Sequence, residues 1–124
     1  MKRSVVIYIK DIIEYMERAE NHINNFQLDQ FLKDDKTCDA VIRCIEVIGE
    51  AAKNIPEEIR IKYPSISWRD LAGMRDKIIH GYFTVDFETV WLVVKEDIPR
   101  LKPMIKIVLE NLEEAEQDPI IADV

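Results

Sequence analysis

The sequence predicts an all-α protein, built as an antiparallel bundle of four to five helices. Turn signals are few, because only three glycines and five prolines occur in 124 residues. Apolar residues recur at three- and four-residue spacing in several segments, and neither a strand pattern nor an internal repeat competes with them. With 48% hydrophobic residues, we expect one small domain over residues 1–116 and an acidic tail over 117–124.

The first half of the chain predicts three helices. An apolar stripe predicts the first helix, from about Ser4 to Asn25. After a polar link, Thr37 is the expected cap of a second helix, which ends before Asn54-Ile55-Pro56. Proline followed by two glutamates is typical of a helix start, so a short helix is expected from Pro56 to just before Tyr63.

The second half of the chain also contains helix signals. One helix is expected from Ser67 to about Gly81, and Asp86 is placed to cap the next. Pro99 should break or kink the chain before a last helix, which fades into glutamates.

The apolar segments of the sequence indicate where in the cell the protein is located. The apolar run near the N-terminus, from Val5 to Ile9, is too short for a signal peptide, and no uncharged stretch could span a bilayer. We therefore expect a soluble, cytoplasmic protein. Cys38 and Cys44 match neither a metal motif nor a redox pair and are expected to be ordinary reduced cysteines.

Charge is unevenly distributed along the chain. The formal net charge of −7 argues against a protein that coats nucleic acid non-specifically. Between Ile59 and Tyr82, however, five basic residues stand against two acidic ones, whereas six acidic and no basic residues follow from Glu110 onward. The basic segment coincides with the candidate site, and the acidic end is expected to be solvated.

Bound metals and cofactors are not expected. Glu46 and Glu50 share a helix face and are the one pair that might suggest a metal, but no His or Asp partner stands near them in the sequence. A solvated or interfacial role is the simpler interpretation. The aromatic residues lie in apolar stripes and are explained as core.

The residues most suited to chemistry are Arg75, His80 and Tyr82. Histidine can give and take a proton near neutral pH, and arginine offers a fork of donors that matches phosphate oxygens. In an ideal helix the five-residue offset from Arg75 to His80 turns by about 140°, so convergence requires a distorted helix end, for which Gly81 is suited, or a second chain. Tyr82 returns to the face of Arg75 if the helix persists. From spacing alone, an interfacial arginine, a capping histidine and a buried tyrosine remain an alternative.

The order Arg-x4-His-x-Tyr resembles the motif of the HepT-like branch of the HEPN proteins. Further landmarks of that family are the segment 48–52, Pro56, and the run 73–75; Tyr63-Pro64, Trp68, Val85-Asp86 and Trp91 also resemble it. The resemblance extends from the first helix to about Leu112. Asp76 is a departure, because the family often has asparagine there, and its carboxylate could pair with Arg75 or repel phosphate.

The resemblance implies a homodimeric toxin, paired with a minimal nucleotidyltransferase antitoxin and cleaving RNA without a metal. Arg75 and His80 would be catalytic. Tyr82 would position the substrate and be the tyrosine that the antitoxin adenylylates, and Asp76 would modulate the site. A non-catalytic nucleotide- or partner-binding dimer regulated through Tyr82 is an alternative, and a structural subunit is a third.

Overall fold

The computed structural model describes residues 4–80 and 84–117, without the side chains of His80 and Gln117. Most of these residues are helical, which confirms the all-α prediction. The exception is a pair of two-residue strands, β1 (Ile79–His80) and β2 (Thr84–Val85). No helix in the described part of the chain is both long and apolar enough to cross a membrane.

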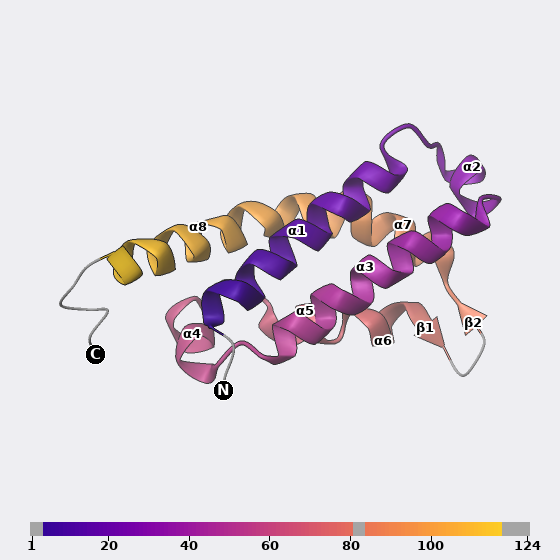
Figure 1. Cartoon of the computed structure of the whole chain (residues 1–124). Helices are drawn as coiled ribbons and strands as arrows, with labels where there is room; N and C mark the ends of the chain where they lie inside the picture. Colours follow the sequence, from indigo (N-terminus) through magenta and orange to yellow (C-terminus); the bar gives the residue numbers. More distant parts are fainter. Residues whose placement is uncertain (1–3, 81–83, 118–124) are drawn as a thin grey trace.

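Three long helices form the body of the molecule. These helices are α1 (Val5–Ile23), α3 (Asp35–Lys53) and α8 (Ile98–Gln117), and α1 packs against both of the others. Both α3 and α8 run opposite to α1, as the sequence predicted for its helices (Figure 1). Each long helix buries one apolar stripe, and among the described residues the core holds no buried polar or charged side chain.

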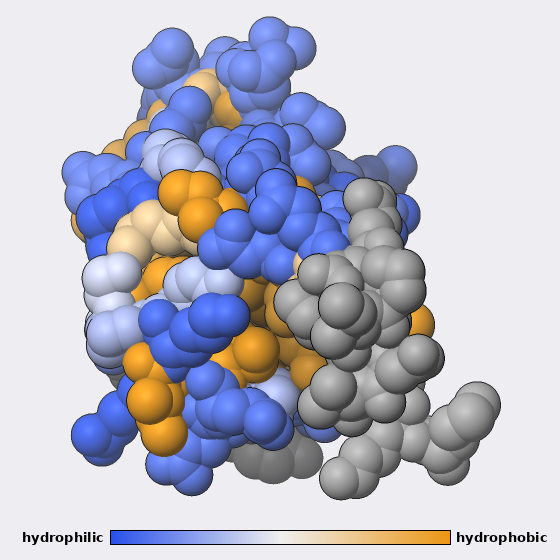
Figure 2. Space-filling view, turned by 90° about the vertical axis from the view of Figure 1, so that its left-hand side faces the viewer, coloured by the Kyte–Doolittle hydropathy of each residue, from blue (hydrophilic) through white to orange (hydrophobic). Residues whose placement is uncertain are grey.

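Short elements connect and cover the long helices. They are α2 (Leu28–Leu32), α4 (Glu57–Lys62), α5 (Trp68–Ala72), α6 (Met74–Ile78), α7 (Phe87–Leu92) and the π-helix η1 (Val93–Asp97). The end of the molecule where α1 begins and α8 ends is mostly hydrophilic, with smaller apolar areas between the polar residues (Figure 2).

The link after the first helix, for which the sequence predicted a polar segment and no helix, contains a short helix. It contains α2, whose start is fixed by a hydrogen bond of 2.8 Å from the backbone N–H of Gln27 to the side chain of Gln30. Phe31 is fully buried, with its ring centroid 5.4 Å from that of Trp91. This long-range aromatic contact stabilises a five-residue helix that periodicity alone does not indicate.

The caps agree with the sequence at one helix and differ at another. Asp86 accepts hydrogen bonds from the backbone and hydroxyl of Thr89, at 3.0 and 2.7 Å, and caps α7 as predicted. The cap of α3 is Asp34, not Thr37, because the Asp34 carboxylate accepts from the backbone N–H of Thr37 at 3.0 Å. The helix therefore begins three residues earlier than predicted.

The single helix expected from Ser67 to Gly81 is interrupted. It is divided at Gly73 into α5 and α6, and the backbone is already extended at Ile79. Pro99 does not end the helical segment, because the π-helix η1 continues directly into α8. A proline ring crowds the carbonyl four residues before it, and a π turn moves that carbonyl away.

Candidate functional site

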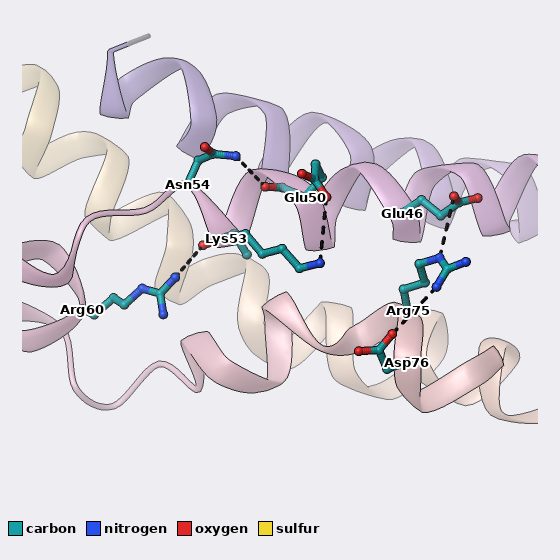
Figure 3. A network of polar contacts seen from close by, with 8 residues as sticks. Glu46, Glu50, Lys53, Asn54, Arg60, Arg75 and Asp76 are labelled. Carbon is teal, nitrogen blue, oxygen red and sulfur yellow. Dashed lines mark hydrogen bonds and ion pairs between the residues drawn. The ribbon is translucent and has the colours of Figure 1, made fainter. Parts of the chain in front are cut away.

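Arg75 lies on the solvent side of α6, between two carboxylates. Its Nε is 3.9 Å from Glu46 Oε2 on α3, and its Nη1 is 3.8 Å from Asp76 Oδ1 (Figure 3). Both distances are longer than a hydrogen bond. The Arg75 side chain is 52% exposed, so the two contacts are loose ion pairs in solvent that orient the guanidinium without occupying its donors.

The position of Arg75 depends on a close approach between α3 and the α5–α6 segment. A Cβ atom added at Gly49 of α3 would lie 3.3 Å from the carbonyl oxygen of Ala72, at the end of α5. Glu46 stands one turn before Gly49 and therefore shares its face of the helix. The missing side chain at Gly49 lets α5 and α6 lie close enough to α3 for Glu46 to meet Arg75.

His80 lies on a strand and not on the helix that carries Arg75. In the antiparallel pair of β1 and β2, Ile79 faces Val85 and His80 faces Thr84, and the backbone N–H of Asp86 donates to Ile78 O at 2.8 Å. The helix thus ends before His80, so the offset of 140° calculated for an ideal helix does not apply. The predicted distortion of the helix end is present, two residues before Gly81.

Tyr82 and Gly81 lie outside the described residues. The prediction that Tyr82 returns to the face of Arg75 required helical geometry up to that point, and the extended backbone at Ile79 and His80 removes this premise. The role of Tyr82 stays a prediction.

The basic residues counted in the sequence do not all gather at one place. Arg60 donates through Nε to Ile55 O at 3.0 Å and through Nη2 to Ala52 O at 3.1 Å, where it satisfies carbonyls at the end of α3. Lys77, two residues after Arg75, reaches Asp97 Oδ2 of η1 at 3.4 Å. Arg60 is therefore structural, and Arg75 and Lys77 lie on different sides of α6.

Glu46 and Glu50 have different partners, so they do not act together. Glu46 faces Arg75, whereas the Glu50 carboxylate is 4.0 Å from Lys53 Nζ, and the Glu50 backbone oxygen accepts from Asn54 (Figure 3). Within the residues that the structure describes, no cluster of three or more His, Cys, Asp or Glu side chains could hold a metal. Sequence reasoning missed the pairing of Glu46 with Arg75. The signal that could have found it is Gly49, because a glycine in an apolar helical stripe indicates close packing one turn away.

Comparison with known proteins identifies relatives over most of the chain. The family model described as "Ribonuclease HepT-like" matches residues 12–108. "Probable ribonuclease HepT" of Thermococcus cleftensis is 51% identical over 102 residues, which cover 82% of this chain and 93% of the relative. "Putative RNase MJ1216" of Methanocaldococcus jannaschii is 42% identical over 119 residues, covering 96% of this chain and 98% of the relative.

No solved structure matches the chain significantly. The match to the family model includes α6, β1 and the helices that position them. The family resemblance predicted from the sequence is thus confirmed, and the chain belongs to the HepT-like ribonuclease family of HEPN proteins.

Proposed function

We propose that the chain is a metal-independent endoribonuclease, the toxin of a toxin–antitoxin pair that acts on RNA in the cytoplasm. The observation that carries the proposal is the placement of Arg75. It lies half exposed on α6, and the strand that bears His80 begins immediately after that helix. The family match and the names of the relatives, which refer to ribonucleases, agree with this proposal.

In the proposed reaction, His80 removes the proton from a ribose 2′-hydroxyl. The 2′-oxygen attacks the adjacent phosphorus, the bond from phosphorus to the 5′-oxygen breaks, and a second acid returns a proton to that leaving oxygen. Arg75 stabilises the charge that develops on the phosphoryl oxygens. Because its contacts to Glu46 and Asp76 exceed hydrogen-bond length, the guanidinium keeps donors for those oxygens.

A homodimer would supply the second acid. Two-fold symmetry would bring two copies of Arg75 and His80 to one cleft, so that one histidine acts as base while the histidine of the other protomer acts as acid. In this proposal the short β1–β2 pair matters because it fixes the backbone of His80 outside the helix, at the edge of each protomer's site.

Tyr82 is the proposed target of the antitoxin, a minimal nucleotidyltransferase. The tyrosine oxygen would attack the α-phosphorus of ATP, pyrophosphate would leave, and the hydroxyl proton would pass to a base of the antitoxin. The added AMP would place a negative charge next to the basic residues of the site and block it. Tyr82 follows His80 by two residues, so its modification would act where the substrate binds.

The test is cleavage of labelled RNA in the presence of a chelator, with the purified parent chain and the variants Arg75→Ala and His80→Ala. Both variants should lose at least a hundredfold in rate while they remain folded and dimeric. Arg18→Ala is a matched control, because Arg18 is 54% exposed and forms a comparable ion pair with Glu14 at 3.5 Å. Equal activity in all four proteins would contradict the catalytic roles.

A non-catalytic binding dimer is the second candidate. It is favoured by the carboxylate of Asp76, which lies 3.8 Å from Arg75 where a phosphate would bind, and by the net charge of −7. In this case the parent chain would bind RNA or nucleotide without cutting it, and adenylylation of Tyr82 would still be detected as a mass increment. A loss of dimerisation in Arg75→Ala would instead indicate a structural subunit.

A further inference from the structure

A hollow of about 530 Å³ lies beside the candidate site, between the α5–α6 segment and the η1–α8 junction. Its volume falls in the range of sites for small ligands. The charged residues that line it come from all four elements, and they are Arg69, Asp70, Asp76, Lys77, Asp97 and Arg100. The hollow therefore differs from an apolar packing defect, and its lining is suited to a charged ligand.

One carboxylate in this hollow faces two cations. Asp97 lies 3.4 Å from Lys77 Nζ through Oδ2 and 3.8 Å from Arg100 Nη2 through Oδ1. The Asp97 side chain is 27% exposed, whereas those of Lys77 and Arg100 are 60% and 62% exposed. The carboxylate thus sits at the base of the cluster, and the two cationic ends reach into solvent with one positive charge left uncompensated.

The other acidic residues do not cancel this charge. Asp76 also lines the hollow, but the cation that its carboxylate pairs with is Arg75, at 3.8 Å, and not Lys77 or Arg100. Asp70 stands beside Arg69 in the sequence, and both line the hollow and are exposed. The charged lining of the hollow is thus neutral as a whole, with three cations and three carboxylates, and the excess of positive charge is local to Lys77 and Arg100, which share Asp97.

We infer that the hollow binds a phosphate of single-stranded RNA next to the scissile one, through Lys77 and Arg100. In the free protein Asp97 would pair with both cations, and the phosphate would compete with its carboxylate for them. Arg75 and Lys77 would bind different phosphates from opposite sides of α6. Arg75 lies at the α3 side of the helix and Lys77 at the η1 side, and Asp76 stands between them in the sequence. This inference rests on the proposed ribonuclease function.

The width of α6 separates the phosphate proposed to bind at Lys77 from the one proposed to bind at Arg75. An α-helix with its side chains is about 10–12 Å wide, so a phosphate held on the η1 side of α6 is not the one that Arg75 contacts. The exposed carboxylate of Asp76 would repel a phosphate over the middle of the helix. The RNA backbone is therefore expected to bind at the two edges of α6 and to bridge the region between them.

The experiment measures binding separately from cleavage. The probe is a fluorescent single-stranded RNA with 2′-O-methyl groups throughout, which cannot supply the attacking hydroxyl, and its anisotropy is followed over a series of salt concentrations. Each phosphate contact contributes about 0.7 to the salt slope of single-strand binding, or about fivefold in affinity at 0.1 M salt. Lys77→Ala and Arg100→Ala should each show this loss.

Asp97→Asn separates an RNA site from a structural ion-pair cluster. In an RNA site, removal of the carboxylate charge should increase affinity several-fold, because both cations become free for phosphate. Weaker binding by Asp97→Asn together with a lower melting temperature would indicate a structural cluster and overturn the inference. Lys95→Ala is the control, since Lys95 also lies on η1 but its Nζ stands 4.9 Å from the centre of the Trp91 ring.

Two results distinguish a failure of this inference from a failure of the proposed function. If the parent chain cuts unmodified RNA but Lys77→Ala and Arg100→Ala bind the probe like the parent, the hollow is not an RNA site. If the parent does not cut RNA and both variants still lose affinity, the ribonuclease proposal fails while the hollow stands as an RNA-binding site.

Discussion

Replacement of Gly49 by valine tests whether the close approach of α3 to α5 and α6 positions the site. The new Cβ would lie 3.3 Å from Ala72 O and 3.6 Å from Leu71 O, both of which are backbone atoms that cannot rotate away. Overpacking of this kind costs about 1–3 kcal/mol, and the better helix propensity of valine over glycine recovers only a few tenths of that. We expect the free energy of unfolding to fall by about 1–2.5 kcal/mol.

Activity should fall further than stability suggests. Relief of the contact moves α6 away from α3, which lengthens the 3.9 Å separation between Arg75 and Glu46. A displacement of about 1 Å at a catalytic group can cost a hundredfold in rate. RNA cleavage by the folded variant, measured well below its melting temperature, should therefore drop at least tenfold.

The assays for this prediction are urea unfolding and RNA cleavage on the same preparations. Glu50→Val is the matched control, because it places valine at the next position of α3, where the native glutamate side chain is 74% exposed. It should cost less than about 1 kcal/mol and leave the cleavage rate unchanged. If Gly49→Val is as stable and as active as the parent, the close approach does not determine the geometry of the site.

Three further predictions concern the scaffold. Arg60→Lys should lower the free energy of unfolding by about 1.5–3 kcal/mol in urea titrations, because lysine cannot donate to both carbonyls at the end of α3. Phe31→Ala should cost about 3–5 kcal/mol, and it should change the fluorescence of Trp91, whose ring it contacts. Burial raises the pKa of Cys38 and Cys44 above the ordinary 9.0, so both thiols should resist alkylation until the protein unfolds. Since the unfolded thiols ionise first, stability should decrease as the pH rises above 9.0, and a constant melting temperature between pH 8 and 10 would contradict this.

The long helices were predictable because their apolar stripes are long and regular. The stripes of α1, α3 and α8 extend over about five turns each, and burial of such a stripe dominates local preferences. The five-residue helix α2 was missed, because its stability comes from the contact of Phe31 with Trp91, sixty residues later in the chain. Periodicity in a short segment carries no information on such a partner.

The roles of the candidate site residues stay predictions, and their arrangement was predicted only in part. Arg75 lies on a helix as expected, whereas His80 was assigned to the same helix and lies on a strand. The hydrogen bond from the backbone N–H of Asp86 to Ile78 O ends the helix, and its donor lies beyond residues 81–83 in the sequence. The spacing of residues within one segment cannot show that a helix ends, when that end depends on a hydrogen bond from a residue eight positions later.

Asp76, which stands where the family often has asparagine, acts on Arg75 together with Glu46. Two carboxylates near one guanidinium would suppress phosphate binding if they were buried with it, but Asp76 is 81% exposed and Glu46 41% exposed. Solvent screening makes such pairs weak, and both distances exceed hydrogen-bond length. A bidentate contact with phosphate is stronger than either pair, so an incoming substrate can displace them. In the proposed reaction the two carboxylates would therefore keep Arg75 extended toward solvent without blocking the phosphate, whereas on the other side of α6 Lys77 and Arg100 share the single carboxylate of Asp97.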